Sequence, residues 1–263
     1  MKSIKTFKLF INDNQKSLDV SKIVRKKLQD NGFVESEEYD LAIAIGGDGS
    51  FLRMVKRANF NSEVLYVGIN AGTLGFAQEV NLSNIDEFIQ NIKENKYRVE
   101  MVGIQKTKVV TKNETSIFYS LNEIAIRDKE LNTVVLNILI DDVELEEYHG
   151  DGILIATSFG STAYNLSFGG SIIYNDFHTL QITPIAPLNN KAYRSLLNSL
   201  VLPEDKTIKV IPRLGNLLIA VDGENKIYDN VSYIETSVED KKIKCLRNLD
   251  YNFSKKINEK FLK

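Results

Sequence analysis

The stretch LAIAIGGDGSFLRMVKRA, residues 41–58, decides the fold class of the first part of the chain. It opens with five apolar residues, as is typical of a parallel strand buried on both faces. Apolar residues then recur at helical spacing, namely Phe51, Met54, Val55 and Ala58. Three glycines and one carboxylate, Asp48, lie between the two patterns. The stretch therefore predicts a strand, a tight glycine turn and a helix.

Helix and strand patterns alternate on both sides of this stretch. Residues 17–33 place apolar side chains on one helical face, and these are Val20, Ile23, Val24 and Leu28. Residues 64–70 (VLYVGIN) are typical of another buried strand. Residues 83–95 predict a helix with Ser83 as its N-cap. This alternation predicts an α/β domain with an open, mostly parallel sheet over residues 1–98.

The pattern changes after residue 98. Short strand-like segments follow one another, separated by polar or Gly/Pro turns, which predicts a β-rich domain over residues 99–248. One helix start is recognisable there, around residues 161–167, and it ends at Gly169-Gly170. The amphipathic tail, residues 249–263, is expected to pack on either domain, the first included.

Composition limits the classes of function. The 263 residues carry a formal net charge of −2, so no basic excess points to nucleic acid or an anionic membrane as partner. No apolar run reaches the ~20 residues of a membrane span, and a signal peptide is not recognisable. The single cysteine, Cys245, cannot form an internal disulfide. We therefore expect a cytoplasmic protein. The two histidines, His149 and His178, have no partner at metal-ligand spacing, so no protein-held metal site is predicted.

The glycine turn has a chemical interpretation. The carboxyl end of a parallel strand opens onto the crevice where α/β sheets bind ligands, and the following helix favours an anion at its N-terminus. Gly46, Gly47 and Gly49 would let backbone amides approach phosphate oxygens. A plain turn explains these glycines but leaves Asp48 unexplained, whereas a phosphate-transfer site explains both. The spacing fits neither a P-loop nor a Rossmann fingerprint.

Four blocks, in this order and at this spacing, resemble the NAD kinases. They are GGDGS (46–50), GINAGTLGF (68–76), SLNEIAI (120–126) and GDGILIATSFGSTAYNLSFGG (150–170). The resemblance runs from roughly Leu41 to Gly223. The first block alone is shared with lipid kinases of the diacylglycerol and sphingosine type. The last two blocks, SLNEIAI and GDGILIATSFGSTAYNLSFGG, are the ones specific to the NAD kinases.

The resemblance implies an activity. An NAD kinase transfers the γ-phosphate of ATP to the adenosine 2′-hydroxyl of NAD and so makes NADP, with a divalent metal such as Mg²⁺ on the nucleotide. By resemblance, Asp48 is the proton acceptor that faces the hydroxyl, and Gly46, Gly47 and Gly49 form the phosphate loop. The family also implies a homo-oligomer, expected to be a tetramer.

The resemblance further implies a set of substrate-binding residues. Asn122 and Glu123 match the pair that grips the adenosine half of NAD. Asp151 matches an aspartate near the nicotinamide end, which in this family reaches the site of a neighbouring subunit. The other implied contacts are Gly49, Phe76 beside the adenine, His149, the turn and helix residues Thr162, Ala163, Tyr164, Asn165 and Ser167, and the peripheral Ala186 and Glu224.

The chain departs from the family pattern at three places. Ser158 and Phe159 stand where a proline and a small hydroxylated residue usually precede the GSTAY block. His149 stands where the family often carries arginine, and an imidazole grips a phosphate less firmly than a guanidinium. Glu224 replaces the usual glutamine after the third Asp-Gly.

Two other functions compete with this interpretation. A lipid kinase would use the same GGDG loop, but it gives no reason for Asn122-Glu123 or for the GSTAY block. A non-catalytic NAD(P)-binding regulator would keep the Asn-Glu pair and would have no need of Asp48. The phosphoryl donor, ATP or polyphosphate, and the use of NADH as acceptor do not follow from the sequence.

Overall fold

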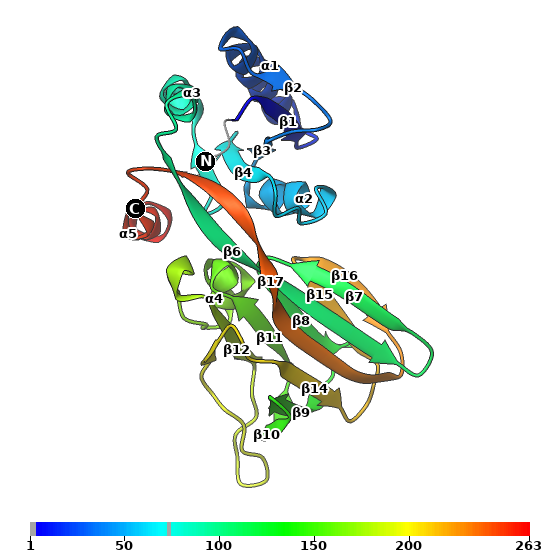
Figure 1. Cartoon of the computed structure of the whole chain (residues 1–263). Helices are drawn as coiled ribbons and strands as arrows, with labels where there is room; N and C mark the ends of the chain where they lie inside the picture. Colours follow the sequence, from blue (N-terminus) through cyan, green and yellow to red (C-terminus); the bar gives the residue numbers. More distant parts are fainter. Residues whose placement is uncertain (1–3, 73–74) are drawn as a thin grey trace. The chain divides into compact units, whose positions relative to one another are not determined.

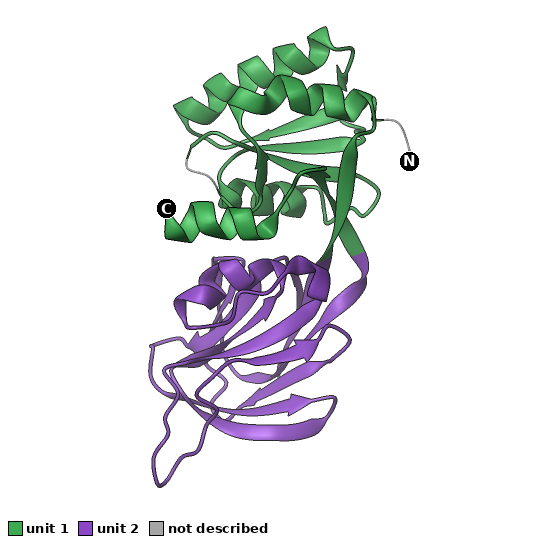
Figure 2. Ribbon diagram, turned by 90° about the vertical axis from the view of Figure 1, so that its left-hand side faces the viewer, with its two compact units in different colours: residues 1–102, 242–263 green, residues 103–241 purple. Residues whose placement is uncertain are grey.

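The computed structural model describes residues 4–72 and 75–263 (Figure 1). The chain divides into two compact units (Figure 2). Unit 1 consists of Met1–Val102 and Lys242–Lys263, and unit 2 is Gly103–Lys241.

Unit 1 is built on parallel strands. They stand in the order β2 (Val34–Glu35), β1 (Thr6–Ile11), β3 (Leu41–Gly46) and β4 (Leu65–Asn70). The short β5 (Gln78–Val80) and the end of β17 (Val231–Asn248) also pair in parallel with β4. All six residues of β3 are buried, as expected for a strand covered on both faces. The predicted α/β domain with a mostly parallel sheet is confirmed.

Three helices connect these strands. Helices α1 (Gln15–Asp30) and α3 (Ile85–Lys93) share one core cluster with the sheet, and α2 (Asp48–Arg57) lies on the other face (Figure 2). The inward residues of α3 are as predicted, namely Ile85, Phe88, Ile89 and Ile92.

Two details of these helices correct the sequence-based prediction. Ile23 is 44% exposed, because the buried stripe of α1 runs through Ser17 and Ser21 instead. Ser83 does not cap α3. It lies in a 3₁₀ turn, Leu82–Asn84, where Asn81 and Asn84 satisfy each other's backbone N–H groups as a capping box.

Unit 2 consists of two antiparallel sheets. The first contains β10-β9-β14-β17, with β6 paired to β17 and β7 to β6, and it is part of an 11-stranded sheet. The second has the order β13-β12-β11-β8-β15-β16. Alternating apolar side chains from both sheets form one core, among them Val109, Leu136, Ile153 and Ile219. The strands not yet placed are β6 (Tyr97–Thr111), β7 (Thr115–Ser120), β8 (Glu123–Asp128), β9 (Val134–Ile140), β10 (Val143–Gly150), β11 (Gly152–Thr157), β12 (Thr179–Ile185), β13 (Leu200–Pro203), β14 (Ile208–Pro212), β15 (Leu217–Val221) and β16 (Glu224–Tyr228). The predicted β-rich second domain is confirmed.

Helical structure in unit 2 is short. A 3₁₀ turn, Phe159–Thr162, leads into α4 (Tyr164–Ser167), and a second 3₁₀ turn covers Asn175–Phe177. They follow β11 and precede β12, so the GSTAY residues stand at one end of a sheet.

Strands β6 and β17 continue through both units, so the boundaries between the units, after Val102 and before Lys242, fall inside these two strands. After β17 the chain forms α5 (Phe253–Ile257) and a π-helical turn, Asn258–Leu262, and both belong to unit 1. In the described part of the chain, no helix combines the length and the apolar character needed to cross a bilayer.

Candidate active site

The glycine loop forms the junction between β3 and α2. β3 ends at Gly46 and α2 begins at Asp48, with Gly47 as its N-cap. Gly46 has φ +149°, and a Cβ there would overlap the Ser50 hydroxyl. Since the N-cap has no side chain, the first N–H groups of α2 are not capped from it. This is the arrangement in which a helix N-terminus attracts an anion.

The carboxylate of Asp48 is held in place by the backbone of a second loop. Its Oδ2 accepts a hydrogen bond from Phe76 N–H at 3.1 Å, and its Oδ1 accepts one from Ala77 N–H at 2.9 Å. Gly75 is required beside it, because a Cβ at that position would overlap the carboxylate. The two strand ends that carry these loops, β3 and β4, are neighbours in the parallel sheet. Asp48 is therefore fixed at the carboxyl edge of the sheet.

Two side chains beside this loop were missed by sequence reasoning. The Arg53 guanidinium donates to Asn12 Oδ1 at 2.6 Å and to Ser50 Oγ at 3.2 Å, which places a positive charge next to the loop. Gln78 is fully buried, and its side-chain amide has no hydrogen-bond partner within residues 4–72 and 75–263. The sequence could have pointed to Arg53, because this residue lies in the helix that follows the glycine loop. No pattern in the sequence pointed to Gln78.

Phe76, predicted to lie beside the adenine, is half-buried in unit 1. Its ring lies 5.2 Å from the ring of Phe261 and 6.0 Å from that of Phe253, measured between centroids. The C-terminal helical segment therefore packs on the loop that holds Asp48.

In unit 2 the Asn122-Glu123 pair lies at the turn from β7 into β8. The carboxylate of Asp222 accepts hydrogen bonds from the backbone N–H groups of three successive residues, Leu121 (2.9 Å), Asn122 (2.8 Å) and Glu123 (3.3 Å). Asp222 stands in the β15–β16 turn with φ +46°. The Asp222-Gly223 turn thus fixes the position of the pair.

Glu123 is a buried acid with unused hydrogen-bonding capacity. Its side chain lies in the interior, and no partner for its Oε2 is present among the described residues. Burial, followed by the nearby Asp222 carboxylate, raises the pKa of Glu123 to about 8. A buried, unsatisfied acid of this kind is typical of a ligand-binding position.

A cavity of about 410 Å³ opens beside this acid. It is lined by Glu123, Ala125, Arg127, Tyr164, Leu218, Ala220, Gly223 and Asn225. Arg127 Nε also has no hydrogen-bond partner in the described part of the chain. Tyr164 is 41% exposed, and its ring stands edge-on to Phe168 at 4.9 Å between centroids. The cavity therefore combines apolar walls, an aromatic ring and three polar side chains, which suits a nucleoside.

The GSTAY block is brought directly against the Asn-Glu turn. Gly160 lies so close to the backbone of Asn122 that a Cβ would overlap its carbonyl oxygen. Thr162 and Ala163 are half-buried, and Ser167 is exposed. Asn165 differs from them, because it is fully buried and its side chain bonds Gln181 and Thr183. It supports the turn from inside the unit.

His149, Asp151 and Ala186 come together where β10 ends and β12 ends. The Asp151 N–H donates to the Ile185 carbonyl at 2.9 Å, and Ala186 follows with φ +45°. The buried His149 ring lies 3.0 Å from Glu147 Oε1 and stacks on Tyr193 at 4.2 Å between centroids. Glu224 is exposed and stands between the cavity residues Gly223 and Asn225. Glu224 therefore stands at the cavity beside Glu123, whereas His149, Asp151 and Ala186 form a separate group at the ends of β10 and β12.

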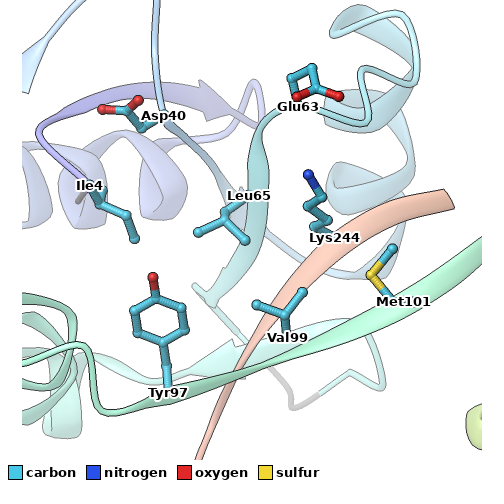
Figure 3. A pocket seen from close by; sticks show the side chains of 8 residues that line it. All are labelled: Ile4, Asp40, Glu63, Leu65, Tyr97, Val99, Met101 and Lys244. Atoms are coloured by element: carbon cyan, nitrogen blue, oxygen red, sulfur yellow. The ribbon is translucent and has the colours of Figure 1, made fainter. Parts of the chain in front are cut away.

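A further cavity, of about 290 Å³, lies in unit 1 (Figure 3). Leu65 begins β4, and Asp40 directly precedes β3, so this cavity is at the amino edge of the parallel strands. Asp40 is bonded there to the N–H groups of Lys5 and Thr6. None of the predicted site residues lines this cavity, because all those of unit 1 follow the carboxyl ends of the strands.

No group of three or more His, Cys, Asp or Glu side chains that could hold a metal ion occurs within residues 4–72 and 75–263.

Comparison with known proteins identifies the family. The ATP-NAD kinase N-terminal domain matches residues 8–97, and the ATP-NAD kinase C-terminal domain matches residues 121–247. The chain belongs to the NAD kinase family. A relative from Finegoldia magna, named NAD kinase, is 40% identical over 98% of both chains. NAD kinase 2 of Bacillus subtilis is 32% identical over 96% of each chain.

Two solved structures, of an NADH kinase and of an NAD kinase, share the fold. Yeast NADH kinase complexed with NADH gives a TM-score of 0.83 at 20% identity, covering 100% of this chain and 88% of the other. An NAD kinase from Archaeoglobus fulgidus in complex with ATP gives 0.73 at 20% identity, covering 97% and 99%. At this identity the two structures show the fold alone. The family matches and the Finegoldia magna relative confirm the family and the phosphotransferase activity predicted from the sequence, and the two structures confirm the fold class.

Proposed function

We propose that this NAD kinase transfers the γ-phosphate of ATP to the adenosine 2′-hydroxyl of NAD, with Asp48 as the acceptor of the hydroxyl proton. One observation carries the assignment of Asp48. Its carboxylate is held by Phe76 N–H and Ala77 N–H at the uncapped start of a helix, in a loop otherwise made of glycine. A plain turn needs no carboxylate there.

In this reaction the orientation of the Asp48 carboxylate matters more than its basicity. A ribose hydroxyl is a poor nucleophile, and a carboxylate is a weak base toward it. Phosphoryl transfer passes through a loose transition state, so the proton can leave late, as the new bond to phosphorus forms. Asp48 would orient the hydroxyl and receive its proton. Gly46, Gly47 and Gly49 would offer backbone N–H groups to the phosphates, where negative charge gathers.

The cavity of unit 2 supports a place for the adenosine half of NAD. Glu123 has an unused oxygen for a ribose hydroxyl, and Tyr164 offers an aromatic edge to a base. The other residues assigned to NAD are Gly49, Phe76, Asn122, His149, Asp151, Thr162, Ala163, Asn165, Ser167, Ala186 and Glu224. Of these, Asn165 would act by supporting the turn.

We assign the divalent metal to the nucleotide. Acidic side chains are scattered through the described residues rather than gathered into a metal site, whereas the phosphates of ATP bring their own ligands for Mg²⁺. When bound, such an ion neutralises charge on the transferred phosphoryl group.

We further propose that the chain forms a homotetramer and works in the cytoplasm. The segment after β12 supports assembly, because it exposes apolar side chains: Leu188, Tyr193, Leu196 and Leu197. Its only cysteine, Cys245, is buried and free, so the fold does not depend on an oxidising compartment.

The experiment compares wild-type protein with Asp48→Asn. Purified protein is incubated with NAD, ATP and Mg²⁺, and NADP is measured with an NADP-specific dehydrogenase. We expect the substitution to lower kcat by about 100-fold or more, because the proton acceptor is lost while NAD binding is retained. Equal turnover by the two proteins would overturn the role of Asp48. Binding of NAD by the wild type without turnover would favour a regulator.

A further inference from the structure

The loop that holds Asp48 is itself held from its other side. Lys256, in α5, points its ammonium at the backbone carbonyls of this loop. Its Nζ donates to Phe76 O at 3.0 Å and to Gln78 O at 2.5 Å. Phe76 therefore donates its N–H to Asp48 while its carbonyl accepts from Lys256.

This contact lies in the interior of unit 1. The side chain of Lys256 is 11% exposed, and its Nζ is 3.5 Å from Glu79 Oε2. Arg247, which is almost fully buried, adds a second cation to the same loop through Ala77 O at 3.3 Å. Arg247 is neutralised mainly by Glu100, with Nη2–Oε2 at 2.7 Å. Two cations from the C-terminal segment thus bind three consecutive carbonyls of residues 76–78.

We propose that Lys256 is a positioning residue for phosphoryl transfer, fixing Asp48 through the backbone of residues 76–78. The inference rests on the proposed role of Asp48. If Lys256 only stabilised α5, its buried ammonium would need no partner besides a carboxylate, and Glu79 provides one. The two carbonyl contacts instead restrain the peptide groups whose N–H atoms orient the Asp48 carboxylate. Small displacements of a reacting group are costly to the rate of catalysis.

The charge of Lys256 is sensitive to pH. Burial, followed by the Arg247 guanidinium, lowers the pKa of the Lys256 ammonium to about 8, and Glu79 and Asp48 oppose this shift. The other charged or titratable groups packed there are Glu100, bonded to Arg247, and Tyr251, whose ring lies 5.0 Å from Lys256 Nζ. Above about pH 8 the amine loses its charge, and its hold on the two carbonyls weakens.

The test compares Lys256→Met and Lys256→Arg with the control Lys255→Met, which alters an exposed lysine of the same helix. NADP formation is measured with saturating NAD and ATP, and again as kcat/KM from pH 6 to 10. We expect Lys256→Met to lower kcat about 10- to 100-fold with little change in the KM for NAD. Lys255→Met should match the wild type.

Lys256→Arg separates a positioning role from a merely structural one. The pH dependence of kcat/KM reports groups of the free enzyme, so the wild type should lose activity above about pH 8. A guanidinium stays charged, so Lys256→Arg should retain activity to a higher pH. Glu123 also titrates near pH 8, and it does so in both proteins, so the readout is the ratio of kcat/KM for Lys256→Arg to that of the wild type, which should rise above about pH 8. The proposal is overturned if this ratio stays constant from pH 6 to 10, or if Lys256→Met keeps the kcat of Lys255→Met. Full activity of Asp48→Asn would instead overturn the proposed role of Asp48, independently of the results for the Lys256 variants.

Discussion

At the scale of single residues, two carboxylates, one in each unit, differ in their hydrogen bonding and burial. Asp48 accepts two backbone hydrogen bonds, whereas Glu123 is buried beside another acid and keeps one oxygen without a partner among the described residues. The first arrangement holds the carboxyl group in a defined orientation. The second favours the neutral acid, and binding of a ligand with hydroxyl groups would satisfy it.

The raised pKa of Glu123 predicts how stability depends on pH. The ordinary value is 4.5 and the folded value is about 8, so the unfolded chain releases this proton first. The protonated Glu123 side chain therefore stabilises the folded state fully below about pH 4.5, and this stabilisation is lost as the pH rises to about 8. Relative to Glu123→Gln, the free energy of unfolding of the wild type should fall by on the order of 1 kcal/mol per pH unit in this window.

Chemical denaturation at several pH values measures this difference. Glu130→Gln, which alters an exposed acid, is the matched control and should follow the wild type. Parallel curves for wild type and Glu123→Gln from pH 5 to 8 would show that Glu123 is ionised in the folded protein.

At the scale of elements, turns decide where the functional residues lie. The β15–β16 turn carries Asp222 to the start of β8, and the β11–α4 connection brings Gly160 against the same point. Each of these elements is short, and none would hold its conformation alone. The Asn122-Glu123 pair is therefore positioned by the packing of these two connections rather than by its own strand.

Asp222→Asn tests this arrangement. An amide offers one acceptor oxygen and no charge to the three N–H groups that the carboxylate holds, so the turn should loosen. We expect the KM for NAD to rise about 10-fold, with a smaller change in kcat. The pKa of Glu123 should fall, because Asp222 contributes to raising it.

Steady-state kinetics with NAD as the varied substrate checks the prediction. Asp229→Asn is the control, since that residue forms an exposed ion pair with Lys129 in a nearby turn and should change little. An unchanged KM in Asp222→Asn would mean that the turn keeps its shape without the carboxylate.

At the scale of the whole molecule, the residues of the proposed function are divided between the two units. Unit 1 contributes the glycine loop, Asp48 and the C-terminal cations, and unit 2 contributes the cavity beside Glu123. Strands β6 and β17 run through both units, so the chain crosses between them within regular structure.

The proposed tetramer can be tested at this scale. Light scattering at micromolar concentration should give a mass of about four chains. Leu197→Asp places a charge on a side chain that is 54% exposed, and it should lower the mass without unfolding the subunit. A monomeric mass for the wild type would contradict the proposal, and circular dichroism would confirm that the variant remains folded.

The sequence by itself determined the local structure and the family. Hydrophobic periodicity is a property of neighbouring residues, so the buried β3, the helix after Asp48 and the β-rich second half were all predictable. The order of the four motifs predicted an NAD kinase, and the family matches confirm it. The individual substrate contacts stay predictions.

Only the tertiary structure decided what holds these residues in place. Asp222 bonds Asn122 across 100 positions, and Lys256 bonds Phe76 across 180. Such contacts depend on strand register and on which element packs against which, and no local pattern encodes either. The prediction that Ile23 lies on the buried face of α1 was wrong for the same reason. Helical spacing predicts that one face is apolar, but packing against the sheet decides which residues of that face are buried.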